Sequence, residues 1–515
     1  MISLRSARDN CGIGGEIRVP FQYRILSRAE EYMIKILFLN PPSLTSENVV
    51  RDSIYGCWCK GKRIGGAMTP PYPQLLLATV MKSEGYGVEL IDALAQYITF
   101  PEIEQRVKDF DFLVLLTSVM TFNEDEIILK RLKEANKNIK TVIYGSLPTF
   151  MPEFCLESDA VDFLIRREAE FALRDFLNYY ASGCEEWKAV KGLGYKEKGL
   201  KRVNDFYPFI DNLDALPFAD WSILKGGNKY FNPSIKRYPY VTDLTTRGCP
   251  GKCIFCMSPA FYGNKVRGRS ADNVLEGFRK HRQEGFKEIY IRDEMFTAFR
   301  ERNREIYKTM IQERMDLTWL CSAKVNTFDK RDLELMKESG CHTLKIGVET
   351  GSQEILNRIK KGVTTEQVRH AFKLAKEAGI ETHAHLMIGH PGETEATIRQ
   401  TIDFVKDLEP TTVTFGMMTP YPGTRLFDIV LEKYPELGNR YTLRLEDLHT
   451  KTYYTDAYCD MPSEELSAWI KRAHRAFYLR PSYMYKSISR IRSYHDLLKI
   501  IKAGFKVIRF SLRGE

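Results

Sequence analysis

Short apolar runs, each of the length of one buried strand, alternate with amphipathic segments along most of the chain. In the N-terminal third, the pattern predicts a helix from Leu75 to Glu84, which Gly85 ends. Alternating strands and helices form parallel βαβ units, so we expect a doubly wound, Rossmann-like α/β sheet in this region. Its strands are predicted at residues 33–42, 88–93, 111–116, 140–145 and 163–165.

The alternation begins again near residue 240 and continues with a period of about 30–40 residues. Amphipathic helices are predicted between its strands, for example from Ala271 to Glu284 and from Thr365 to Ala378. Six such units predict a partial (β/α)6 barrel, in which the loops that follow the strands form the active site. The strands are expected near residues 240–245, 288–292, 317–323, 343–348, 382–388 and 412–417.

These two regions set the predicted domain boundaries. The segment between them contains Pro208 and Pro217 and is interpreted as a connection. Because the first predicted strand begins at Met33, we hypothesise that translation starts there and that residues 1–32 are not part of the native protein. The predicted parts are a sheet domain at 33–180, a linker at 181–235, a barrel at 236–430 and a helical, basic C-terminal region at 431–515.

The composition fits a globular protein of more than one domain. The chain has 515 residues, of which 43% are hydrophobic and 28% charged, and this argues against extended disorder. No apolar run reaches the ~18 residues that a membrane span needs, and the polar segment at 1–18 lacks the apolar core of a secretory signal. We therefore expect a cytoplasmic protein.

Positive charge is concentrated at the C-terminus. The net charge is +9, whereas residues 471–515 alone contain 12 basic and 2 acidic residues, so no nucleic-acid partner is expected. The last helix lies either on an anionic membrane surface, as in a peripheral membrane protein, or on the barrel with its lysines in water. Basic residues recur on one face of this predicted helix at Lys499, Lys502, Lys506, Arg509 and Arg513, and apolar residues on another at Leu497, Ile501, Phe505, Ile508 and Leu512.

Three of the eleven cysteines are grouped in one short segment. The number is odd and the chain looks cytoplasmic, so a disulfide framework is not expected. Cys249, Cys253 and Cys256 are separated by three and two residues, and a zinc site would need a fourth ligand close by. The nearest candidates, His281 and Cys321, are distant in sequence. Three thiolates in one loop suit a cubane iron–sulfur cluster with one open iron, which can bind a small molecule.

This triad, with Phe255 before its third cysteine, resembles the signature of the radical S-adenosylmethionine (SAM) superfamily. The resemblance implies a [4Fe-4S] cluster on Cys249, Cys253 and Cys256, with SAM chelated by the fourth iron. It also implies that the reduced cluster cleaves SAM and that the resulting 5′-deoxyadenosyl radical removes hydrogen from an unactivated carbon. Four further motifs follow in the order of the family, at Ile289–Phe296, Ile346–Ser352, Met387–Thr394 and Thr419–Thr424.

These motifs supply the other candidate site residues. By similarity, Glu349 would accept hydrogen bonds from the ribose and Ser352 would donate to the methionyl carboxylate of SAM. Asp293 and Glu294 are the catalytic candidates, which would meet the methionyl ammonium or a substrate hydroxyl. Further SAM-binding candidates are Gly389 after the fifth strand and Pro420 and Tyr421 in the loop after the sixth.

Other interpretations of these residues remain open. Glu349 is alternatively the partner of a lysine such as Lys345, and Asp293 with Glu294 is alternatively a helix N-cap pair. His383 and His385 share one face of a predicted strand, with His390 just beyond it; they either bind a metal or line a pocket. We expect the pocket, because histidines near strand ends in a barrel more often line the pocket than bind a metal.

The N-terminal domain resembles the cobalamin-binding domain of one large subgroup of that superfamily. Residues 166–170 occupy the place of a Gly-Glu-Gly-Glu-like turn, from which Arg167 and Ala169 depart. None of the nine histidines lies in the first 280 residues, so cobalamin would bind without a lower histidine ligand from this domain. Ser118, just after a strand end, is expected nearest the corrin. The alternative is an empty doubly wound scaffold.

The C-terminal segment Phe477–Pro481 resembles that of hopanoid-modifying and porphyrin ring-forming members of the subgroup. We therefore predict a radical SAM enzyme that acts at an unactivated carbon of a small or lipid-like, hydrophobic substrate. The reaction is radical methylation or oxidative cyclisation or rearrangement, with an electron donor such as flavodoxin or ferredoxin. The alternatives are a methylthiotransferase-like enzyme, disfavoured because no second cysteine triad is present, and a corrin- or redox-responsive binding protein with a structural cluster.

Overall fold

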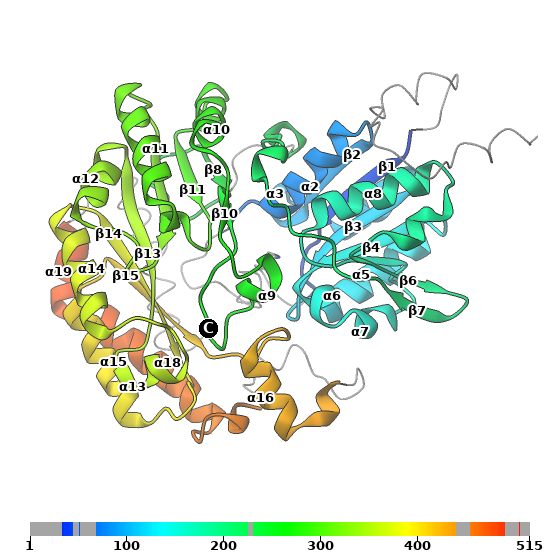
Figure 1. The fold of residues 1–515 in the computed structure, drawn as a ribbon. Coiled ribbons are helices and arrows are strands. Elements are labelled where there is room, and N and C mark those ends of the chain that lie inside the picture. The colour runs from blue at the N-terminus through cyan, green and yellow to red at the C-terminus, as the bar shows by residue number, and fades with distance from the viewer. Residues whose placement is uncertain are drawn as a thin grey trace, which may run out of the picture.

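The computed structural model describes residues 33–44, 51, 68–224, 230–438, 454–489 and 504, which form two α/β units (Figure 1). The predicted basic helix near residues 497–513 and the segment at 1–32 lie outside the described residues. Among the helices that are described, none combines the length and the apolar character that crossing a bilayer requires.

The N-terminal unit is a doubly wound sheet, as predicted. Its strand order is β2-β1-β3-β4-β5-β6-β7, and the first five strands in this order are parallel. Between β1 and β3 the order in which strands are added to the sheet reverses, and open α/β sheets bind ligands at such a switch point. The parallel strands are β1 (Lys35–Asn40), β2 (Gly87–Asp92), β3 (Phe112–Thr117), β4 (Lys140–Gly145) and β5 (Phe163–Ile165).

Helices cover both faces of this sheet and explain why its central strands are apolar throughout. Helices α2 (Tyr72–Ser83) and α8 (Ala169–Ala181) bury one face, and α5 (Phe122–Ala135) buries the other. Every residue of β3 is buried. A strand buried on both faces is continuously apolar, so a run of apolar residues rather than an alternation identified it in the sequence.

The segment that was predicted as a linker adds two strands to this sheet. Strand β6 (Leu193–Glu197) pairs antiparallel with β5, and β7 (Leu200–Val203) pairs with β6. Lys198 and Gly199, both with positive φ, form the tight turn between them. The sheet therefore extends beyond the predicted boundary at residue 180.

The second unit is the partial parallel barrel that the sequence predicted. All six strands lie in the order in which they occur along the chain, and helices such as α10 (Ala271–Gln283), α14 (Thr365–Glu377) and α15 (Glu395–Leu408) pack on the outer face. The strands are β8 (Tyr240–Asp243), β11 (Glu288–Ile291), β12 (Thr318–Ala323), β13 (Cys341–Glu349), β14 (Glu381–Ile388) and β15 (Thr412–Met417).

Helix α18 (Ser463–Tyr478) covers the outer face of the last strand, and α19 (Pro481–Ser489) follows it. The Tyr478 hydroxyl accepts a hydrogen bond from Val413 N (2.9 Å) and donates one to Val413 O (2.6 Å). The C-terminal region is thus helical where it is described, and it completes the core of the barrel.

The two units meet along the carboxyl edge of the N-terminal sheet. Phe150, at the end of α6 (Ser146–Phe150), packs on Phe261 of α9 (Ser258–Tyr262) with ring centroids 6.4 Å apart. Helix α16 (Arg425–Lys433) contributes to the core of the N-terminal sheet. The ligand-binding edge of the first unit therefore faces the loops of the second (Figure 1).

Candidate active site

The three clustered cysteines lie in a loop between β9 (Thr246–Arg247) and α9. Gly248 begins the loop with φ +92°, and a Cβ there would lie 2.3 Å from Lys265 O, so only glycine fits. Cys249 N donates to Gly263 O (3.1 Å), and Ile254 N donates to Ile359 O (3.1 Å). The loop is thus fixed to neighbouring segments at its first cysteine and again between its second and third cysteines.

The chemistry of these donors fits a cluster. Burial raises the pKa of Cys253, and it raises the pKa of Cys256 to about 12, so both are protonated thiols until a metal displaces the proton. Among the described residues, no three His, Cys, Asp or Glu side chains are gathered as one metal ion would require. In a cubane cluster each cysteine binds a different iron, so the three thiols need not converge on one point.

Glu349 is paired with a lysine that the sequence analysis missed. It ends β13 with φ +66°, and its Oε1 lies 2.5 Å from Lys361 Nζ, with both side chains nearly buried. Burial opposes the charge of Lys361, but Glu349 and Cys253 outweigh it and raise the pKa of the lysine. The proposed partner Lys345 donates to the Tyr290 hydroxyl instead (2.9 Å). No local pattern distinguishes Lys361 from its exposed neighbour Lys360.

Asp293 lies beneath the cysteine loop. Its carboxylate accepts hydrogen bonds from Thr245 N and Oγ1 (2.6 Å each) and from Thr246 Oγ1 (2.8 Å), where the chain enters that loop. Burial raises the pKa of Asp293. These contacts make Asp293 a support of the loop rather than a helix N-cap, while Glu294 beside it is half-buried. A catalytic role for either residue stays a prediction.

The remaining SAM candidates lie at the same rim. Ser352 is buried and caps α13 (Gln353–Arg358), where its Oγ accepts from Ile355 N (3.5 Å). Gly389 N donates to Glu393 Oε2 (2.6 Å), an acidic residue that the sequence analysis did not select. Neither contact tests binding of SAM, so both assignments stay predictions.

The loop after β15 faces the N-terminal unit. Pro420 and Tyr421 lie in this loop, and the Tyr421 side chain is buried in a core that it shares with Met257 of the cysteine segment and Val430 of α16. Tyr421 therefore helps to join the two units. Whether either residue contacts SAM is not tested by this packing.

Ser118 lies where it was expected, just beyond the end of β3, beside the point where the strand order reverses. It is buried, its N donates to Thr121 Oγ1 (3.1 Å), and its Oγ accepts from Met120 N (3.3 Å). The neighbouring Thr117 hydroxyl donates to Asp125 (2.8 Å). This edge offers hydroxyl and backbone groups, and a corrin contact of Ser118 stays a prediction.

A buried ion-pair network joins the cysteine loop to the N-terminal unit. Arg247, two residues before the first cysteine, contacts Glu170 (2.5 Å) and Glu168 (3.2 Å), and Arg267 also contacts Glu168 (2.8 Å). Burial opposes ionisation of Glu170, but Arg247 holds its pKa below the usual value. All four side chains are nearly inaccessible to solvent, so the charges depend on each other.

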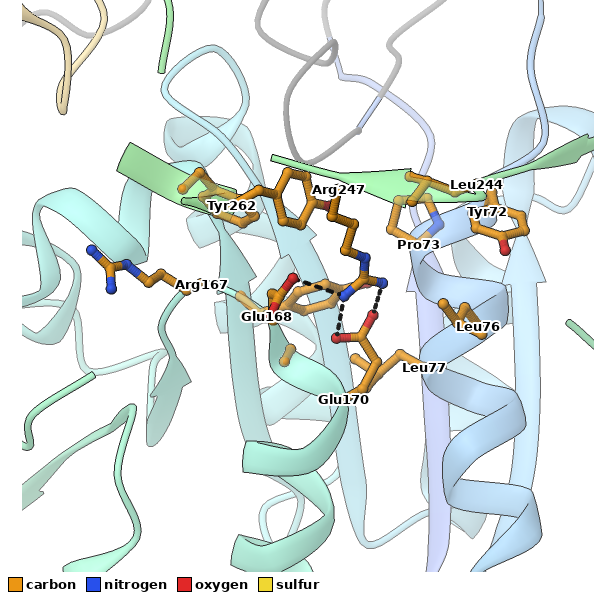
Figure 2. Close-up of a pocket in the computed structure, with 13 residues that line it drawn as sticks. Tyr72, Pro73, Leu76, Leu77, Arg167, Glu168, Glu170, Leu244, Arg247 and Tyr262 are labelled. Atoms are coloured by element: carbon orange, nitrogen blue, oxygen red, sulfur yellow. Dashed lines mark hydrogen bonds and ion pairs between the residues drawn. The ribbon is translucent and has the colours of Figure 1, made fainter. Parts of the chain in front are cut away.

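The network uses Glu168 and Glu170 of the turn at residues 166–170, whereas Arg167, one of the two departures in that turn, lies outside it. Arg167 has φ +63°, a conformation that favours glycine, and its guanidinium stacks on Phe206 (3.6 Å) and Phe209 (4.7 Å). Figure 2 shows Arg247 directed at Glu168 and Glu170, while Arg167 points away. The adjacent cavity has a volume of about 20 Å³, which is room for roughly one water molecule.

His383 and His385 line the interior of the barrel. Their ring centroids are 4.4 Å apart, and their Nδ1 atoms lie within hydrogen-bond distance of Thr412 (2.6 Å) and Thr414 (3.0 Å). The pocket interpretation fits this geometry, since the described residues contain no third ligand for a metal here. His390 is buried behind them, with Nε2 3.4 Å from Glu349 O.

Two family models match the chain, one for each unit. Residues 244–405 match the Radical SAM superfamily, and residues 66–177 match the B12 binding domain. The first match contains the cysteine loop and Glu349. The second contains Ser118 and most of the parallel strands of the first sheet.

Known relatives span both units. The chain is 33% identical over 463 residues to an uncharacterized methyltransferase, PH0819, of Pyrococcus horikoshii, covering 88% of this chain and 95% of the relative. It is 25% identical over 458 residues to the anaerobic magnesium-protoporphyrin IX monomethyl ester cyclase of Rubrivivax gelatinosus, covering 85% and 80%. The same fold occurs in the cobalamin-dependent SAM radical enzyme OxsB, solved with aqua-cobalamin and SAM (TM-score 0.65, 17% identity, covering 93% and 72%).

Proposed function

Because the chain belongs to the radical SAM superfamily, in the group with an N-terminal B12-binding domain, we propose that it methylates an unactivated carbon by radical chemistry. The observation that carries this proposal is the junction between the units. The carboxyl edge of the B12-binding unit faces the cysteine loop, and the ion pairs of Arg247 hold the two together. Transfer of a methyl group from a corrin to a substrate carbon requires this proximity.

The enzyme uses a [4Fe-4S] cluster, SAM and cobalamin. When bound, these cofactors supply a carbon radical that removes hydrogen and a methyl group that replaces it. We assign the three irons that carry protein ligands to Cys249, Cys253 and Cys256. Lys361 would stand beside the thiolates with its charge and hold Glu349 toward the ribose of SAM.

Cobalamin would bind at the edge near Ser118. The sequence offers no histidine in the first 280 residues, so this unit cannot supply an imidazole below cobalt. The described edge residues offer small hydroxyls, such as those of Ser118 and Thr121, and backbone groups. These fit a corrin that is held through its periphery.

Radical SAM enzymes act on small molecules and require a reductant. We propose flavodoxin or ferredoxin as the donor, a substrate with an apolar body, and contact of the C-terminal segment with a membrane surface. Because β7 pairs within the first sheet, we propose that the first domain extends to Val203 and that the connection runs from residue 204 to 235.

Oxidative ring formation is the second candidate, favoured by the similarity to the Rubrivivax cyclase over both units. Anaerobic incubation with reconstituted cluster, SAM, cobalamin, reductant and candidate substrates separates the two reactions. Methylation predicts 5′-deoxyadenosine together with S-adenosylhomocysteine by mass spectrometry. 5′-Deoxyadenosine with a ring-formed product and no S-adenosylhomocysteine would contradict methylation.

The matched variants for this experiment are Cys253→Ala and Cys321→Ala. Cys253 belongs to the triad, whereas Cys321 is buried in the outer core of β12. We expect Cys253→Ala to lose the cluster absorbance and all 5′-deoxyadenosine. Cys321→Ala should keep both, because its thiol touches only the core.

A further inference from the structure

The inner face of the last three barrel strands is accessible and carries polar residues or glycine along most of its length, as far as the buried Met387 near the end of β14. Side chains alternate along these strands, and the outward ones, such as Ile346, Ala384 and Val413, are buried in the core. The inward ones remain half-buried, and His385 is exposed. This polar inner face consists of Lys345 and Gly347 on β13, His383 and His385 on β14, and Thr412, Thr414 and Gly416 on β15.

The opposite side of the barrel interior is closed. Tyr240, Tyr290 and Leu320 are buried there against Tyr230 and Ile235, in one hydrophobic cluster. A molecule that enters the barrel therefore meets the polar inner face on one side and the edge of an aromatic cluster on the other.

Positive charge dominates the polar inner face. Lys345 Nζ donates to the Tyr290 hydroxyl and lies 4.4 Å from the centre of that ring, and the Arg292 guanidinium lies 5.8 Å from the same centre. Within the described residues, no carboxylate pairs with Lys345. Glu349 at the rim is already matched by Lys361.

The acidic groups at the other end of the strands are also paired. Glu288 contacts His342 (2.9 Å), and Glu381 contacts Lys236 (2.8 Å). They offer nothing to neutralise Lys345, because each already has a basic partner.

The two imidazoles add neutral hydrogen-bonding groups. His385 faces the barrel interior, where the surrounding protein disfavours its charged form, and this desolvation together with the charge of Lys345 lowers its pKa to about 3. Burial, His385 and Lys345 lower the pKa of His383. Thr414 lies within hydrogen-bond distance of His385 Nδ1 (3.0 Å), and among the described residues no group is hydrogen-bonded to its Nε2. A neutral His385 can therefore offer one ring nitrogen to a ligand beside Lys345.

The polar inner face reaches the cysteine loop. A Cβ on Gly347 would lie 2.5 Å from Glu349 Oε1 and 2.8 Å from Lys361 Nζ, so these two side chains occupy the space above Gly347. The charge of Lys361 acts in turn on Cys253. One end of a molecule on this face thus lies close to the reacting centre.

We propose that the polar inner face binds an anionic group of the substrate, a carboxylate or a phosphate, through Lys345 and His385. This inference rests on the proposed function, because it assigns a substrate class to the same site. A lysine ammonium and an imidazole N–H both donate to an oxyanion, and the lysine has no competing carboxylate. An apolar substrate would therefore carry an acidic group at the end that enters the barrel.

The test is anion binding to the full-length protein with its cluster reconstituted and oxidised. Inorganic phosphate is titrated by ³¹P NMR line width and ¹³C-labelled propionate by saturation transfer, with and without SAM. We expect saturable binding that Lys345→Met weakens about tenfold or more and Lys345→Arg largely restores. The probe that binds more tightly identifies the anionic group as a phosphate or a carboxylate. Either order of the two affinities supports the proposal.

The matched control is Lys330→Met on α12 (Lys330–Glu338), whose side chain is 72% exposed and far from the barrel interior. It should bind both anions as the wild type does. Tyr290→Phe and His385→Gln, which keep the ring or the side-chain volume, should each weaken binding and serve if Lys345→Met fails to fold.

Equal binding by Lys345→Met and wild type would overturn the proposal. Competition between SAM and the anion would also overturn it, because the anion would then occupy the position of the methionyl carboxylate. The titration contains no reductant, so its result is independent of radical chemistry. Failure of the proposed function would appear only in the nucleoside assay.

Discussion

The ammonium group of Lys361 interacts both with the carboxylate of Glu349 and with the cysteine thiols. Its ammonium lies 2.5 Å from Glu349 Oε1, and burial of the pair strengthens the interaction. Backbone bonds from Ile254 to Ile359 keep the cysteine loop beside this segment. The lysine therefore affects both the charge of the cluster site and the direction of the glutamate.

Replacing Lys361 by Met should lower the reduction potential of the cluster by on the order of 50 mV, because reduction adds negative charge that the lysine no longer offsets. An EPR-monitored redox titration of the reconstituted protein measures this shift. Lys373→Met, on the solvent face of α14 with a side chain 73% exposed, is the control. An unchanged potential in Lys361→Met would show that its charge does not reach the cluster.

The sequence identifies the residues whose chemistry depends on their spacing in the chain. It does not identify the residues that come together only in the folded structure. The triad of Cys249, Cys253 and Cys256 follows from spacing alone. Lys361 and Glu393 could not be selected, because their roles depend on contacts with Glu349 and Gly389 across separate loops. Asp293 was selected, but its threonine partners became visible only in the structure.

Helix α18 contributes a buried, neutral histidine to the outer face of β15. The Nδ1–H of this residue, His474, donates to Ile470 O (2.9 Å), and its Nε2 accepts from Phe415 N (3.5 Å). Burial lowers the pKa of His474 to about 4. A proton on Nε2 would oppose the N–H of Phe415, so the folded state excludes it.

The unfolded chain binds that proton at an ordinary pKa near 6.5, so stability should fall as pH drops from about 6.5 toward 4. At pH 5 this group should make the protein about 2 kcal/mol less stable than at pH 7. Urea unfolding followed through the fluorescence of Trp469 on α18 measures the difference. His383 and His385, whose pKa values are also lowered, contribute to the same pH dependence, so the difference between pH 7 and pH 5 should be about 2 kcal/mol smaller in His474→Gln than in the wild type. His370→Gln, at an exposed position on α14, should keep the wild-type difference. A difference of wild-type size in His474→Gln would contradict the assignment.

Regular elements were predicted well because each is marked by a local pattern. The parallel strands of both sheets appear within a few residues of their predicted positions. Those of the first sheet are largely continuous apolar runs, and those of the barrel keep apolar residues on their outer face. The β6–β7 hairpin was missed because its second strand, Leu200–Val203, is exposed and has no apolar pattern. Only the turn at Lys198 and Gly199 marked it in the sequence.

Buried ion pairs join the two units; they are formed by Arg247, Arg267, Glu168 and Glu170. Removing one charge from such a network leaves its partner buried without compensation, which costs more than the pair contributes. Because Arg247 ends β9 directly before the cysteine loop, the same ion pairs fix the cluster site relative to the B12-binding unit.

Arg247→Met should lower the free energy of unfolding by about 3–5 kcal/mol. Urea unfolding gives this value, and a double-mutant cycle with Glu170→Gln measures the coupling between the two charges. Arg279→Met, which breaks an exposed pair with Glu313, should cost at most ~1 kcal/mol. A loss for Arg247→Met as small as that of the control would mean that the network does not hold the junction.

The order of the barrel strands also bears on how the protein is made. In the six-stranded barrel sheet, each strand after β8 pairs with the strand of that sheet that precedes it in the chain, so every strand after the first leaves the ribosome with its neighbour already synthesised. The first sheet differs, because β1 pairs with β2 and β3, both of which are synthesised after it. Growth of the barrel at one edge keeps contacts short in sequence, and α18, the helix that covers the last edge, is translated after all six strands.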